Sequence, residues 1–163
     1  MSKKQDFTYQ FTTIHSLFYS LMKCEPKVMK YFSTIHTSFA INFVFSNNIT
    51  ILIGLSAAGK TAAFSFIREC MAINPQIVCL NYLDYQKDIK EMLTQMKNKM
   101  IVIDNADILL DDETRKFISL DENNQYLIIG RNPKNLFTTK DNLFELVSNK
   151  NEDVTEFWIQ PYL

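Results

Sequence analysis

The chain has 163 residues, of which 47% are hydrophobic and 21% are charged, and its formal net charge is −1. This composition is typical of a globular protein and argues against a disordered or fibrous one. The length fits a single domain over residues 1–163, which we divide into an N-terminal helical extension (1–37) and a core (38–163). Because 17 basic residues are balanced by 18 acidic ones, the basic footprint of a dedicated nucleic-acid binder is missing.

Neither the cysteines nor the apolar segments point to secretion or to a membrane. Cys24, Cys70 and Cys79 are odd in number and lack metal-ligand spacing, as expected for reduced thiols in a cytoplasmic protein. The N-terminus has no apolar stretch of the secretory type. The long run with few charges, 31–59, splits into two apolar blocks separated by polar residues, which favours strands over a membrane helix.

The N-terminal third predicts helices followed by a strand pair. Apolar residues at helical spacing indicate a helix over Thr12–Lys23, with a second short helix through Val28–Phe32. Residues 38–45 alternate between apolar and polar, and Ile49–Ile53 forms a second apolar block. The turn signal Ser46-Asn47-Asn48 between them predicts a hairpin-like lead-in to Gly54.

The remainder alternates between helices and strands. We expect strands at Gln76–Tyr82, Met100–Ile103, Tyr126–Ile129 and Val154–Ile159, and helices at Thr61–Met71, Tyr85–Lys97, Asp111–Leu120 and Asn142–Val147. This alternation predicts an α/β fold: a three-layer sandwich with a mostly parallel sheet covered by helices on both faces.

The segment Gly54-Leu55-Ser56-Ala57-Ala58-Gly59-Lys60-Thr61 fits the phosphate-loop pattern G-x-x-x-x-G-K-[ST]. It follows an apolar strand and opens a helix, which is the context that this motif requires. The glycines let successive backbone N–H groups converge on phosphate oxygens, and the helix N-terminus adds partial positive charge. We therefore expect the loop and the next residue, Ala62, to bind ATP, with Lys60 on the β- and γ-phosphates and the Thr61 hydroxyl on Mg²⁺.

A second acidic position follows the most apolar strand. Asp104 comes directly after Ile101-Val102-Ile103, and the carboxyl end of a buried parallel strand lies at the edge where ligands bind. Asp104 is therefore a candidate to hold the Mg²⁺ complex. The alternative is an ordinary aspartate at the end of a strand.

These motifs together resemble the P-loop ATPases that have an added strand between the Walker A and Walker B strands, as in the AAA and STAND groups. The resemblance covers roughly residues 38–163 and rests on Gly54–Thr61, the strand 76–82, the segment 101–107 and Ile128-Ile129-Gly130-Arg131. It implies a P-loop NTPase fold, Mg²⁺-dependent use of ATP, and a γ-phosphate-sensing role for Arg131. A planar cation suits that charge, although Arg131 could equally be a solvated loop arginine paired with a nearby acid.

One position departs from that pattern. Where those ATPases commonly have a glutamate that polarises the attacking water, this chain has Asn105, and an amide cannot accept the proton. Asp84, after the intervening strand, and Asp107 are the carboxylates that could substitute as base. Both could instead be surface or helix-capping aspartates.

Three functions remain open on the sequence. The first is an ATPase that is slow or needs a partner, by self-association or with another protein. The second is a nucleotide-gated binding module that does not hydrolyse, for which Asn105 is the best evidence. The third is a small-molecule kinase, which the shortage of arginines after Asp104 disfavours. ATP is preferred to GTP because no Asn-Lys-x-Asp guanine motif occurs.

Overall fold

The computed structural model describes residues 25–54, 59–131, 138–151 and 153–162, so the helix predicted at Thr12–Lys23 lies outside the described residues. The strands are β1 (Tyr31–His36), β2 (Phe39–Val44), β3 (Ile49–Ile53), β4 (Ile77–Leu80), β5 (Met100–Ile103), β6 (Gln125–Ile129), β7 (Leu143–Lys150) and β8 (Thr155–Pro161). The helices are α2 (Lys60–Glu69), α3 (Ile89–Gln95), α4 (Ala106–Leu109) and α5 (Asp112–Leu120), with short 3₁₀ helices η1 (Cys70–Ala72) and η2 (Tyr82–Asp84).

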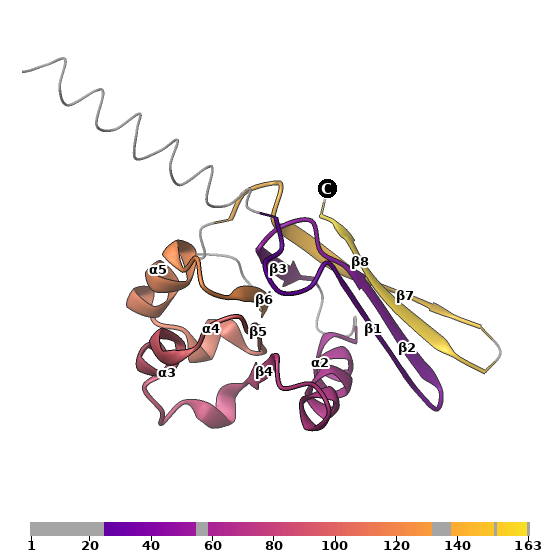
Figure 1. The fold of residues 1–163 in the computed structure, drawn as a ribbon. Coiled ribbons are helices and arrows are strands. Elements are labelled where there is room, and N and C mark those ends of the chain that lie inside the picture. The colour runs from indigo at the N-terminus through magenta and orange to yellow at the C-terminus, as the bar shows by residue number, and fades with distance from the viewer. Residues whose placement is uncertain (1–24, 55–58, 132–137, 152, 163) are drawn as a thin grey trace, which may run out of the picture.

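Within the described residues these strands form one eight-stranded mixed sheet in the order β1-β2-β8-β7-β3-β6-β5-β4. The five strands β7, β3, β6, β5 and β4 are parallel to their neighbours in this series. The pairs β1–β2 and β7–β8 are antiparallel, and a parallel pairing of β2 with β8 joins them. Both antiparallel pairs extend to one side of the molecule, away from α3, α4 and α5 (Figure 1).

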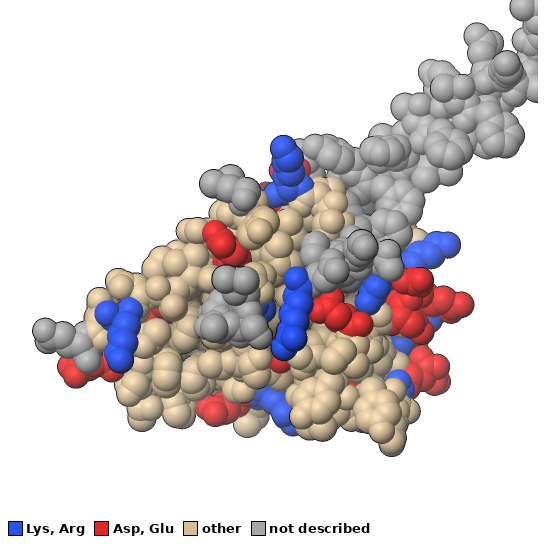
Figure 2. Space-filling view, turned by 180° about the vertical axis from the view of Figure 1, so that it is seen from behind, with Lys and Arg blue, Asp and Glu red and all other residues tan. Residues whose placement is uncertain are grey.

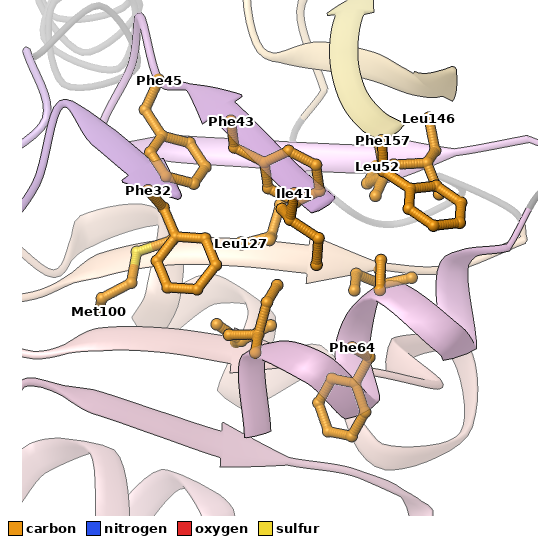
Figure 3. Close-up of a cluster of buried hydrophobic side chains, with 14 of the residues drawn as sticks. Phe32, Ile41, Phe43, Phe45, Leu52, Phe64, Met100, Leu127, Leu146 and Phe157 are labelled. Atoms are coloured by element: carbon orange, nitrogen blue, oxygen red, sulfur yellow. The ribbon is translucent and has the colours of Figure 1, made fainter. Parts of the chain in front are cut away.

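The predicted three-layer P-loop NTPase sandwich with a mostly parallel sheet is wrong. The sheet is mixed and curls into a half-barrel, and the helices of the described residues are few and short. The physical reason is visible in the first core cluster, where side chains from the outer strands, such as Phe32, Phe43 and Phe157, pack together with Leu52 and Leu127 of the inner strands (Figure 3). The outer strands and α2 thus bury the face that a helical layer would otherwise have covered.

The second core cluster lies on the other face of the inner strands, against α3, α4 and α5. Strand β3 shows how one sequence serves both cores: Ile49, Ile51 and Ile53 belong to this cluster, whereas Leu52 belongs to the first. All five residues of β3 are buried, as are all those of β5 and β6. Continuous apolar runs of this kind fit parallel strands that are covered on both faces.

Three local predictions are also wrong. Strands β2 and β3 do not pair with each other as a hairpin, because β2 pairs with β1 and β8, and β3 pairs with β6 and β7. The short helix predicted at Val28–Phe32 is replaced by irregular chain that leads into β1. The helix predicted at Asn142–Val147 is strand β7, in which Phe144 and Leu146 are buried with a period of two.

None of the helices in the described part of the chain is long and apolar enough to cross a membrane.

Candidate phosphate-binding site

The two ends of the phosphate loop are held by glycines with positive φ. Gly54 follows β3 with φ of 127°, and Gly59 precedes α2 with φ of 82°. Side-chain-bearing residues rarely adopt such angles, so both positions require glycine. The Gly59 carbonyl accepts the N–H of Ala63 at 2.9 Å, which begins α2 directly after the loop. Residues Leu55, Ser56, Ala57 and Ala58 lie outside the described residues.

Lys60 is the first residue of α2, and its side chain folds back toward the end of β3. Its Nζ donates to the carbonyl of Gly54 at 2.6 Å, and the residue is only 7% exposed. Burial lowers the pKa of Lys60, the nearby Arg131 guanidinium lowers it further, and Asp104 acts in the opposite direction. The ammonium group therefore lies between the loop and two charged groups that follow other strands. Thr61 and Ala62 complete the first turn of α2, with Thr61 exposed.

Asp104 follows β5 and is 5% exposed. Its Oδ1 accepts the backbone N–H of Asn105 at 2.9 Å. Burial raises the pKa of Asp104 above its ordinary value, and the Asn105 hydrogen bond and the Lys60 charge offset this only in part. The carboxylate is thus held beside the cation of the loop in a poorly solvated position, where a second cation would be favoured.

Asn105 has a backbone conformation that accounts for an asparagine at this position. Its φ and ψ are 55° and 39°, in the left-handed region, and it forms the N-terminal boundary of α4. Asparagine adopts this region far more readily than most residues with a side chain. A glutamate in the same place would therefore be strained.

Asp107, in the first turn of α4, contacts the chain at the end of β6. Its Oδ2 accepts the backbone N–H of Arg131 at 2.7 Å. A Cβ at Gly130 would come within 3.2 Å of Asp107 Oδ1, so the carboxylate packs against the one residue without a side chain in that turn. Asp107 thereby fixes the turn that carries Arg131, which is itself exposed.

One pocket brings most of these groups together. It has a volume of about 260 Å³ and is lined by Lys60, Thr61, Asp104, Asn105, Asp107, Ile108, Ile129, Gly130 and Arg131. Ligand pockets commonly measure about 300–1,000 Å³, so this one lies just below the small end of that range. The pocket lies at the carboxyl ends of β5 and β6, and β3 ends at the same edge of the sheet because these strands are parallel.

Asp84 is not among the residues that line this pocket. It lies in η2, where its Oδ2 accepts the N–H of Asn81 at 3.0 Å and its Oδ1 pairs with Lys87 at 2.6 Å. Burial acts to raise the pKa of Asp84, but the hydrogen bonds from Lys87 and Asn81 outweigh it, and the pKa is lowered. These contacts favour the helix-capping interpretation of Asp84.

Two apolar residues that line the pocket, and one that lies against the loop, had no predicted role. Ile108 is 72% exposed at the rim of the pocket, and Ile129 ends β6 inside it. Phe157 of β8 lies against the loop at Gly59. The strand pattern could have identified Ile129, because it immediately precedes Gly130. No local signal connects Phe157 with a loop so distant in the sequence.

On the face seen in Figure 2, lysine and arginine side chains are scattered singly among acidic ones. Among the described residues, no group of three or more histidine, cysteine, aspartate or glutamate side chains is placed to hold a metal ion. A magnesium ion would instead use the Thr61 hydroxyl and Asp104 together with phosphate oxygens, and hard oxygen ligands of this kind suit Mg²⁺.

No protein-family model matches the sequence. No curated protein matches it significantly either.

Proposed function

We propose that this chain binds ATP with Mg²⁺ at the loop Gly54–Thr61 and hydrolyses it slowly, or only when a partner completes the site. The observation that carries the proposal is the convergence of Lys60, Asp104 and Arg131 on one pocket at the N-terminus of α2. Two cations and the partial positive charge of a helix N-terminus favour a ligand with several negative charges.

The chemistry that these residues support is the binding and orientation of phosphates. Lys60 would exchange its hydrogen bond to the Gly54 carbonyl for phosphate oxygens, and Arg131 faces the same space from the end of β6. Bound Mg²⁺ would neutralise phosphate charge between the Thr61 hydroxyl and Asp104. The resemblance to ATPases with an added strand stays a proposal, and the grouping of Lys60, Asp104 and Arg131 around one pocket supports it.

Slow hydrolysis follows from the groups that line the pocket. Asn105 cannot accept a proton, and Asp107 already accepts the N–H of Arg131. Of the two carboxylates considered as base, Asp107 lines the pocket and Asp84 does not. Asp107 is therefore the better candidate, and to act as base it would exchange the hydrogen bond that it accepts from the Arg131 N–H for one from a water molecule.

A nucleotide-gated module that binds without hydrolysis is the second candidate. The observation in its favour is the left-handed backbone at Asn105, because a glutamate base is disfavoured there on conformational grounds. The two functions share the same binding site and differ only in turnover.

The test is ATP binding and phosphate release, with and without Mg²⁺, for the purified protein and for Lys60→Ala. A charged hydrogen-bonding group contributes about 1.5–3 kcal/mol, so we expect Lys60→Ala to bind about 10- to 100-fold more weakly. Lys90→Ala is the matched control, because Lys90 pairs with Glu113 on the surface and does not line the pocket.

Binding with phosphate release supports the ATPase. Binding without release, and without a phosphorylated acceptor, supports the gated module. If the intact protein does not bind ATP, or if Lys60→Ala and Lys90→Ala bind equally well, the proposal is wrong.

A further inference from the structure

The phosphate loop is in direct contact with the outer, curled part of the sheet. A Cβ placed on Gly59 would lie 2.7 Å from Cε1 of Phe157, 3.4 Å from its Cζ and 3.7 Å from its Cδ1. The ring thus occupies the space in which any other residue at position 59 would have its side chain. Gly59 is required twice, once for its positive φ and once for this contact.

Phe157 is itself held firmly. It is 5% exposed and belongs to the first core cluster, together with Leu52 and Leu146 (Figure 3). In the middle of β8, its backbone is aligned with Ile41 of β2 on one side and with Ser148 of β7 on the other. A ring fixed by two neighbouring strands yields little to a residue that approaches it.

The same ring is linked to the helix that follows the loop. Phe157 stacks on Phe39 of β2 with ring centroids 6.1 Å apart, and Phe39 contacts Phe66 of α2 with centroids 4.9 Å apart. The outer strands therefore contact the N-terminal glycine of α2 through Phe157 and the helix two turns further along through Phe39. His36 of β1 adds a ring contact to the same Phe66, with centroids 5.5 Å apart. These contacts help to set where the helix N-terminus lies relative to β3.

We propose that Phe157 is a positioning residue for the phosphate loop, setting the backbone conformation at Gly59 and thereby the affinity of the site for nucleotide phosphates. This inference rests on the proposed function. It makes the outer strands of the half-barrel part of the binding site, although they contribute no group that lines the pocket. The affinity of a phosphate loop depends on the direction of its N–H groups, so a small shift at Gly59 weakens several contacts at once.

The first test compares Phe157→Leu with Phe43→Leu. Phe43 is 1% exposed in the same core cluster, where its ring packs edge-on against Phe45, so Phe43→Leu controls for the loss of core packing. We expect both variants to lower the melting temperature, and only Phe157→Leu to weaken Mg²⁺–ATP binding, by about ten-fold. Phe157→Tyr, which keeps the ring, should retain most of the wild-type affinity.

The second test measures the contact without any nucleotide. Gly59→Ala is made in the wild-type and in the Phe157→Leu background, and the melting temperatures form a double-mutant cycle. The backbone strain of alanine at positive φ is common to both backgrounds and cancels. We expect Gly59→Ala to lower the melting temperature less when Phe157 is absent, because the close approach to the ring is then removed.

The outcomes separate the inference from the proposed function. Additive melting temperatures in the cycle refute the contact. A coupled cycle with equal ATP affinities for wild type and Phe157→Leu refutes the positioning role and leaves the proposed function intact. A coupled cycle in a wild-type protein that binds no ATP refutes the proposed function and the affinity claim together. Weaker binding by Phe157→Leu alone, with a coupled cycle, supports both.

Discussion

Replacing Asp104 by asparagine should make the ligand-free protein more stable at neutral pH. Asparagine has nearly the same shape as aspartate. Its amide oxygen can accept the hydrogen bond from the Asn105 N–H that the carboxylate accepts at 2.9 Å in the wild-type protein. The substitution removes a negative charge from a side chain in a residue that is 5% exposed. Because the pKa of Asp104 is raised in the folded protein, ionisation costs more free energy there than in the unfolded chain.

The size of the effect follows from three contributions. Burial of the carboxylate is the largest and unfavourable one, and the Asn105 hydrogen bond and Lys60 oppose it without cancelling it. When asparagine replaces the carboxylate, the hydrogen bond from the Asn105 N–H has a neutral acceptor and weakens by about 1 kcal/mol. The raised pKa of Asp104 already reflects this hydrogen bond, so the net effect of the substitution remains stabilising. Single stabilising substitutions commonly gain about 0.5–2 kcal/mol, and we expect Asp104→Asn to fall within this range. This gain corresponds to a rise of about 1–8 °C in melting temperature for a chain of this size.

The assay is thermal unfolding of wild type and Asp104→Asn without nucleotide, from pH 7 downward. The raised pKa means that the carboxylate costs stability above its unfolded-state pKa of about 3.9, so the advantage of Asp104→Asn should be greatest at neutral pH. It should shrink as the pH falls through the folded-state pKa and vanish near the unfolded-state value. Asp111→Asn is the control of opposite sign, because hydrogen bonding with Thr114 lowers the pKa of Asp111 and its charge stabilises the fold.

A lower melting temperature for Asp104→Asn at pH 7 would refute the reasoning, as would an advantage that does not change with pH. If the proposed function is correct, saturating ATP and Mg²⁺ should reverse the order of the two proteins. Only the wild-type carboxylate can then gain from a bound cation.

Two further predictions concern neighbouring contacts. Gly130→Ala places a Cβ 3.2 Å from Asp107 Oδ1 and should lower the free energy of unfolding by about 1 kcal/mol as the hydrogen bond from the next residue weakens. Urea denaturation measures this cost, and it should largely disappear in an Asp107→Ala background; an undiminished cost there would contradict the explanation. Tyr126→Phe removes a fully buried hydroxyl that donates to Asp121 Oδ2 at 2.5 Å. We expect this substitution to lower the free energy of unfolding by about 1.5–3 kcal/mol. Tyr31 is 67% exposed, so Tyr31→Phe should leave the free energy of unfolding almost unchanged in urea denaturation. If Tyr31→Phe and Tyr126→Phe lowered it equally, burial of the hydroxyl would not be the cause.

The inner strands could be predicted from the sequence because they are apolar runs with few alternatives. Strand β5 has the bounds that were predicted, Met100–Ile103, and the predicted strand at Tyr126–Ile129 differs from β6 by one residue. The position of the charged and glycine residues that follow these strands could be predicted as well, because parallel strands end at a common edge of the sheet. That is why Lys60, Asp104 and Arg131 could be grouped before their positions were known.

The strands that curl the sheet could not be predicted in the same way, because distant partners determine them. Phe144 and Leu146 fit a helix as well as a strand locally, and pairing with β3 and β8 decides between the two. Asn47 and Asn48 have the composition of a hairpin turn. Their side chains instead bond to distant carbonyl groups, those of Asp141 and Asn124, and so hold the start of β3 beside other parts of the chain.

The pairing of β2 with β8 has a consequence for the order in which the molecule can be made. A ribosome that adds about 5–20 residues per second completes β2 and β3 well before it reaches β7 and β8, which are their neighbours in the finished sheet. Until then the nascent chain has two unpaired strand edges of the kind that chaperones protect, and closing so long a loop slows folding. Phe157 is synthesised long after Gly59, so the loop at Gly59 reaches its final surroundings only once β8 has been made.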